Sequence, residues 1–190
     1  FFLGWLQPRL ITEPENITLE ELNSTNTALM ITESDTANLI GNDPNPTTFY
    51  LLENRQQSGW DKYLHGHGMM LTKIQYSSSK WYNNTVNNTA TAMGVDLIEA
   101  DGIAPELGNS GYNYGKTSDL FPAGNTEYIG IENHPINNIQ EKNGVITFNY
   151  KNVGTSTSGN INYELNGGVT NDDGWLNKND MFQACMADCG

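Results

Sequence analysis

The sequence predicts a mostly β protein, an antiparallel β-sandwich with long loops and only short helices. The 190 residues include 19 Gly and a large share of Asn, which favour turns and left-handed backbone over long helices. Aromatic residues make up 10% of the chain and charged residues only 16%, as is typical of a folded domain. Short apolar segments recur between polar turns, a spacing typical of β-sandwiches.

Three short strands are expected near the start of the chain. Residues 16–22 alternate in character, so that Ile17 and Leu19 share one side of the strand. The polar residues 23–26 predict a turn after it. The flanking segments expected to form strands are residues 6–12 and 28–32.

Two longer segments carry the strongest strand signal. Residues 47–54 contain four apolar residues in succession, which indicates a strand buried on both faces. Residues 68–76 are expected to form a second long strand. The connection between them is expected to hold one helical turn at residues 59–64 and a Gly-rich turn at residues 65–68.

The rest of the chain is predicted to be irregular up to a closing hairpin. Residues 77–135 are rich in Asn, Gly, Ser and Tyr, with one short apolar stretch at residues 95–100. So long a loop is usually functional, or is held by ions or packing. Residues 136–140 and 145–150 are expected to pair, because Asn143-Gly144 favours a type I′ hairpin turn.

The composition also predicts where the folded domain ends. We expect residues 1–151 to form the β-sandwich domain, and residues 152–190 to form a Gly- and Asn-rich tail or the start of a further module. A short helix is expected at residues 177–188, and Cys185 and Cys189 are expected to lie outside the core.

The charge of the chain excludes two classes of partner. Nine Lys and Arg against 22 Asp and Glu give a net charge of −13. Nucleic acid and anionic membrane surfaces are excluded, because both require a basic face. No apolar run is long enough for a membrane span.

Five segments, taken together and in order, resemble a known family. The longest is YLLENRQQSGWDKYL at residues 50–64, which continues into Gly66-His67-Gly68. The other four are GWL at residues 4–6, GVDLIEADG at residues 94–102, DLFPAG at residues 119–124, and the hairpin at residues 136–150. About residues 1–151 resemble the immune-inhibitor-A-like family of secreted bacterial zinc metalloproteases, in the region after the catalytic zinc motif. Two departures are His65, where the family usually has Pro, and residues 72–75 (TKIQ), where it often has WHID.

The resemblance implies a secreted or cell-surface bacterial protein, with Zn²⁺ in a catalytic domain that precedes these residues. Zinc-water chemistry of this class needs a Glu between the two His of an H-E-x-x-H motif, and the sequence contains no such motif. We therefore expect no catalytic residue here and no activity of the isolated chain. The expected role is a non-catalytic β-sandwich portion that packs on the catalytic domain and supports peptide-bond hydrolysis by the parent protein. The apolar start, Phe1 to Trp5, is where that domain is expected to attach.

A group of residues at and beyond the end of the strand at 47–54 is expected to have a structural role. The residues are Glu53, Asn54, Arg55, Asp61 and His67. Glu53 and Arg55 are expected to form an ion pair or to anchor the following loop. His65, His67 and His134 are the potential zinc ligands, but no third ligand lies in the segment of the first two, which favours histidines that pack in loops.

Four carboxylates in the long loops are candidate calcium ligands. They are Asp96, Glu99, Asp101 and Asp119. Hard oxygen ligands on Gly-containing loops suit Ca²⁺, while the alternative is that these residues form Asx turns and helix caps. A second, weaker set of oxygen ligands consists of Asn171, Asp172, Asp173, Asn179 and Asp180.

The aromatic residues of the loops support an alternative function. Trp60, Trp81, Tyr82, Tyr112 and Tyr114 would form a stacking platform for sugars. The chain would then be a carbohydrate- or surface-binding module of a secreted bacterial protein. The competing explanation is that these rings serve core and loop packing.

Overall fold

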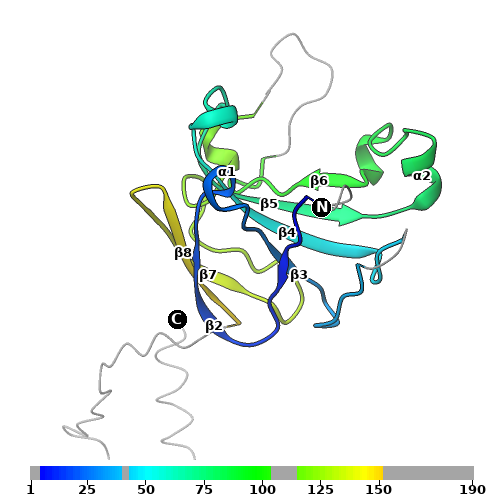
Figure 1. Cartoon of the computed structure of the whole chain (residues 1–190), viewed down its shortest axis with the longest axis horizontal. Helices are drawn as coiled ribbons and strands as arrows, with labels where there is room; N and C mark the ends of the chain where they lie inside the picture. Colours follow the sequence, from blue (N-terminus) through cyan, green and yellow to red (C-terminus); the bar gives the residue numbers. More distant parts are fainter. Residues whose placement is uncertain (1–4, 40–42, 104–114, 152–190) are drawn as a thin grey trace, which may run out of the picture. The chain divides into compact units, whose positions relative to one another are not determined.

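The computed structural model describes residues 5–39, 43–103 and 115–151, which are mostly β with only short helices, as the composition predicts (Figure 1). The strands are β1 (Arg9–Leu10), β2 (Glu15–Leu19), β3 (Leu29–Ile31), β4 (Thr48–Arg55), β5 (Gly68–Gln75), β6 (Val95–Leu97), β7 (Ile136–Lys142) and β8 (Val145–Tyr150). The helices are α1 (Leu22–Thr25) and α2 (Ser78–Tyr82), with 3₁₀ turns η1 (Gly59–Asp61), η2 (Ala90–Ala92) and η3 (Thr117–Asp119). The predictions for residues 1–4 and 152–190, for Cys185 and Cys189, for the oxygen ligands at 171–180, and for Tyr112 and Tyr114 lie outside the described residues.

The strands form two sheets, and one of them departs from the antiparallel prediction. The five-stranded sheet has the order β1-β3-β4-β5-β6, and the three-stranded antiparallel sheet has the order β2-β8-β7. β1 pairs parallel with β3, so the larger sheet is mixed. After β1 the chain crosses to the smaller sheet to form β2. It then returns to the larger sheet, where β3 runs in the same direction as β1.

Strand β4 separates two apolar clusters, one on each face of the larger sheet. Tyr50 and Leu52 point to the inner face, while Phe49 and the half-buried Leu51 point to the outer face. This confirms that the apolar run at residues 47–54 is buried on both faces. Residues of β4 that are two apart share a face, so Glu53 belongs to the outer face as well.

The inner cluster draws side chains from both sheets. From the larger sheet come Leu29, Ile31, Tyr50, Leu52, Met69 and Leu71, and from the smaller sheet Ile17, Leu19, Ile136, Ile139, Ile146, Phe148 and Tyr150. In β2, Ile17 and Leu19 are buried while the residues between and beside them are exposed, which confirms the alternation.

The closing hairpin has the predicted turn. Asn143 and Gly144 have φ angles of 53° and 78°, and a type I′ turn needs positive φ at both central residues. The remaining differences from the prediction are local. Residues 22–25 form one helical turn and not a plain loop, and the long segment after β5 contains α2 and β6. No helix in the described segments has the length and apolar character that a membrane span requires.

Candidate functional site

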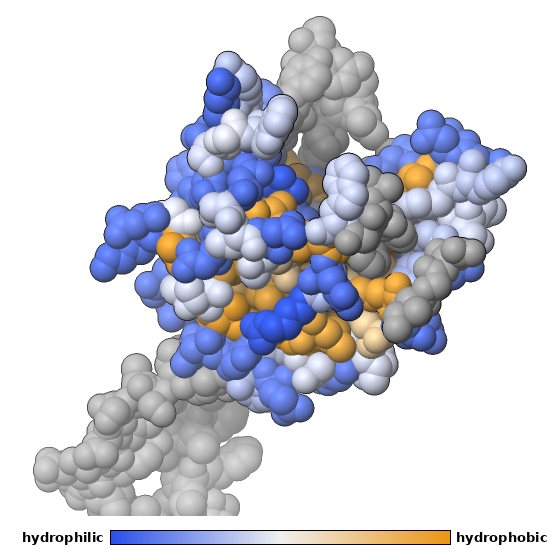
Figure 2. Space-filling view, in the orientation of Figure 1, coloured by the Kyte–Doolittle hydropathy of each residue, from blue (hydrophilic) through white to orange (hydrophobic). Residues whose placement is uncertain are grey.

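The outer face of the five-stranded sheet is the main candidate for a functional surface. The register of β4 and β5 places Phe49 opposite Ile74, and Leu51 opposite Thr72, on this face. At one end, Met30, Phe49 and Ile74 are buried under further side chains, including those of Tyr76 and Trp81. Figure 2 shows that apolar surface continues over the middle of the sheet, bordered by hydrophilic side chains.

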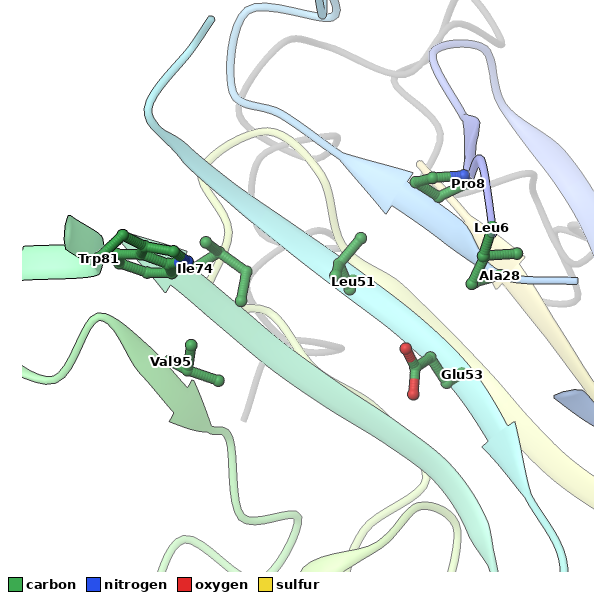
Figure 3. A pocket seen from close by; sticks show the side chains of 8 residues that line it. All are labelled: Leu6, Pro8, Ala28, Leu51, Glu53, Ile74, Trp81 and Val95. Carbon is green, nitrogen blue, oxygen red and sulfur yellow. The ribbon is translucent and has the colours of Figure 1, made fainter. Parts of the chain in front are cut away.

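A shallow apolar hollow lies on this face (Figure 3). It encloses about 230 Å³ and is lined by Leu6, Pro8, Ala28, Leu51, Glu53, Ile74, Trp81 and Val95. Leu51 on β4 lies in the middle, between Ala28 on one side and Ile74 on the other. Val95 is 38% exposed, and seven of the eight lining residues are apolar. We call these eight residues the apolar hollow. An apolar surface rimmed by polar groups is typical of an interaction site.

Three charged residues form an ion-pair network at one edge of the apolar hollow. The Arg55 guanidinium lies 2.6 Å from the Glu53 carboxylate and 3.1 Å from that of Asp61. Burial opposes the charge of Arg55, but the two carboxylates outweigh this effect and raise its pKa. Asp61 belongs to η1, so these contacts fix the loop after β4 to the strand.

Asn54 has a different role, because it points to the inner face. Its side chain is fully buried, and its Nδ2 donates to the carbonyl oxygens of Leu19 and Gly144, each at 2.8 Å. Its Oδ1 accepts a hydrogen bond of 2.7 Å from Gln56. Leu19 and Gly144 belong to the smaller sheet and its hairpin turn, so Asn54 ties the two sheets together. The sequence placed Asn54 in the structural group but did not indicate that it is buried.

Two of the three histidines have side-chain partners, and these partners differ. His67 Nδ1 lies 2.8 Å from Glu141 Oε1, which links the loop before β5 to β7. His134 is buried, with Nδ1 against the carbonyl of Glu132 and Nε2 3.1 Å from Asp35. His65 is exposed.

The four calcium candidates lie on neighbouring segments after β5. Burial, followed by the like charges of Asp96, Asp119 and Asp101, raises the pKa of Glu99. Asp101 accepts hydrogen bonds of 2.7 and 2.9 Å from a serine hydroxyl and a backbone N–H, as an Asx turn would. Asp119 is buried; its Oδ2 accepts a backbone N–H at 2.7 Å, while its Oδ1 has no partner among the described residues. Within the described segments, no three His, Cys, Asp or Glu side chains are placed so as to hold a metal ion.

The aromatic residues of the predicted platform that the structure describes lie on two different elements. Trp60 is 95% exposed on η1, which precedes β5, whereas Trp81 and the exposed Tyr82 lie on α2, which follows β5. Eight residues of extended strand separate the two positions, a length of roughly 25 Å. A stacking surface shared by Trp60 and Trp81 stays a prediction.

The apolar hollow itself was missed by reasoning from the sequence. The signal in the sequence was the apolar run in β4. Its outer side chains belong partly to the cluster that packs with Trp81, and Leu51 also lines the apolar hollow.

Comparisons with protein-family models, with curated proteins and with solved structures found no match to this chain.

Proposed function

We propose that this chain is a non-catalytic β-sandwich portion of a secreted bacterial zinc metalloprotease, and that it packs on the catalytic domain of the same parent protein through the apolar hollow. The observation that carries the proposal is the apolar hollow on the outer face of the larger sheet. The ordered resemblance of five sequence segments to the immune-inhibitor-A-like family supplies the identity of the partner.

The physical argument starts from the cost of leaving this face in water. Burial of apolar surface contributes about 25 cal/mol per Å², so every further roughly 40 Å² that a partner covers around the half-buried Leu51 and the 38%-exposed Val95 would contribute about 1 kcal/mol before the costs of association. Interfaces commonly have such an apolar centre and a polar rim. The paired side chains of Glu53, Arg55 and Asp61 provide a polar border at one edge.

The sandwich arrangement is part of the same proposal. Its support is the inner cluster, which contains residues of both sheets, together with the hydrogen bonds that Asn54 donates to the smaller sheet. Two sheets held in this way would present the outer face of the larger sheet as a rigid platform. Its role in peptide-bond hydrolysis would be to support the catalytic domain and border its substrate cleft, while that domain supplies Zn²⁺ and the general base.

The test is a binding measurement between this chain and the zinc-protease domain of the same coding sequence. Calorimetric titration should give a saturable complex, which Val95→Asp weakens at least ten-fold because the partly exposed Val95 borders the apolar hollow. Leu51→Thr, a milder change that keeps a strand-compatible side chain, should weaken it as well. The matched control is Ile129→Asp, since Ile129 is 73% exposed but does not line the apolar hollow. Absence of binding, or an equal loss in the control, would refute the proposal.

A further inference from the structure

A second hollow adjoins the first at the α2 end of the larger sheet. It is shallow and wide open, with a volume of about 460 Å³, and is lined by Trp81, Asn84, Val86, Asn87, Asn88 and Val95. We call these six residues the asparagine hollow. We propose that the asparagine hollow binds a neutral sugar. This inference does not rest on the proposed packing on a catalytic domain, although the two hollows share Trp81 and Val95.

The chemistry of the lining selects an uncharged ligand with both apolar and hydroxyl-bearing faces. The six residues supply one indole ring, two aliphatic side chains and three amides, and none of them is ionisable. A phosphate or carboxylate ligand would find no cation here, and a metal ion would find no carboxylate or imidazole. A sugar ring presents C–H groups that stack on an aromatic face, and hydroxyl groups that both donate and accept. An amide likewise offers a donor and an acceptor.

The side-chain amide of Asn87 stabilises the backbone that lines the asparagine hollow. Asn87 Oδ1 accepts from the N–H groups of Gly94 and Val95, each at 3.0 Å, and its Nδ2 donates to the carbonyl of Val95 at 2.8 Å. These three bonds tie the loop that follows α2 to the start of β6. Asn87 therefore positions the wall and has little hydrogen-bonding capacity left for a ligand.

The ring of Trp81 is also held in place. Its centroid lies 5.0 Å from that of Tyr76, and a Cβ at position 94 would lie 2.9 Å from both the indole and Val86. The absence of a side chain at Gly94 is what lets the two lining residues approach. A ring fixed in this way loses little conformational entropy when a ligand stacks on it.

The remaining two amides are available to a ligand. Asn84 and Asn88 are exposed, and within the described residues their side chains have no hydrogen-bond partner. The backbone N–H of Asn84 donates to the carbonyl of Trp81 at 3.2 Å, so this amide lies directly beyond the last turn of α2. A sugar stacked on Trp81 would lie beside the Asn84 and Asn88 amides, which fix its orientation.

The experiment is an NMR titration of the whole chain with glucose, galactose, mannose and N-acetylglucosamine. One stacked ring and two amides correspond to a Kd of about 1 mM, so each sugar is raised to about 20 mM. At least one sugar should cause saturable shifts of the Trp81 indole N–H and of the Asn84 and Asn88 amides. Asn84→Gly, which suits the φ of 54° at this position, should weaken binding about five-fold.

The matched control is Asn83→Ala, because Asn83 is exposed at the end of α2 but does not line the asparagine hollow. It should leave the affinity unchanged. Trp81→Ala should abolish binding. Because Trp81 also packs in the outer cluster, this variant could fail to fold, and the comparison of Asn84→Gly with Asn83→Ala then tests the proposal. No saturable shift with any of the four sugars, shifts located elsewhere, or an equal loss in Asn83→Ala and Asn84→Gly would overturn the proposal.

Discussion

Replacing Asn54 by Leu tests whether one buried amide joins the two sheets. Leu has nearly the shape of Asn but cannot donate, so the carbonyls of Leu19 and Gly144 lose their hydrogen bonds of 2.8 Å. A buried acceptor left without its donor costs about 1–3 kcal/mol. The bond to Gly144 is only partly buried, and water can compensate there, so we expect a total loss of about 3 kcal/mol.

This loss is large on the scale of a domain that is stable by about 5–15 kcal/mol. For a domain of this size it corresponds to a fall in Tm of about 6–12 °C. Urea denaturation followed by tryptophan fluorescence should show a lower midpoint with an unchanged slope, since the surface exposed on unfolding stays the same.

The control is Asn16→Leu, which makes the same chemical change at an exposed position of β2. It should alter the free energy of unfolding by less than about 0.5 kcal/mol. A loss below about 1 kcal/mol in Asn54→Leu, or equal losses in the two variants, would show that Asn54 does not tie the sheets together.

Three further predictions concern the ionisable groups. Burial opposes the charge of Asp35, but hydrogen bonds from Lys151 and His134 outweigh it and lower the pKa of Asp35 below 3.8. Its stabilising contribution is therefore complete above pH 3.8 and is lost as the pH falls further, so Asp35→Asn should flatten the acid limb of a Tm-against-pH curve in that range. The pKa of Glu99 is raised above 4.5, so its ionisation opposes folding at neutral pH, and Glu99→Gln should raise Tm at pH 7 but not at pH 4; an unchanged Tm at pH 7 would contradict this. If the carboxylates around Glu99 bind Ca²⁺ as proposed from the sequence, about 1 mM CaCl₂ should raise Tm of the native protein and have less effect on Glu99→Gln, whereas no rise would remove the proposal.

Local patterns predicted the elements of the fold better than their arrangement. The alternation around Ile17 and Leu19, the apolar run of β4 and the Asn143-Gly144 turn depend on neighbouring residues, and all three appear in the structure. The division into two sheets and the parallel pairing of β1 with β3 depend on contacts between distant segments, which a local pattern does not encode.

The candidate site shows the same limit. The charged residues Glu53 and Arg55 were recognisable because they end the apolar run of β4, and in the structure Arg55 pairs with both Glu53 and Asp61. The apolar hollow could not be predicted, because it combines Leu6, Leu51 and Val95 from three parts of the chain. Whether an apolar residue is covered or open depends on the packing of distant elements, as the cover that Trp81 gives to Ile74 illustrates.

The most direct test of the central claim is hydrogen–deuterium exchange of this chain, alone and with the zinc-protease domain of the same coding sequence. Our account predicts slower exchange in the complex at β1 and β6, the edge strands nearest the apolar hollow, and no change at β7, which belongs to the other sheet. Unchanged exchange at β1 and β6, or protection confined to β7 and β8, would contradict the proposal that the apolar hollow on the outer face of the larger sheet is the docking surface.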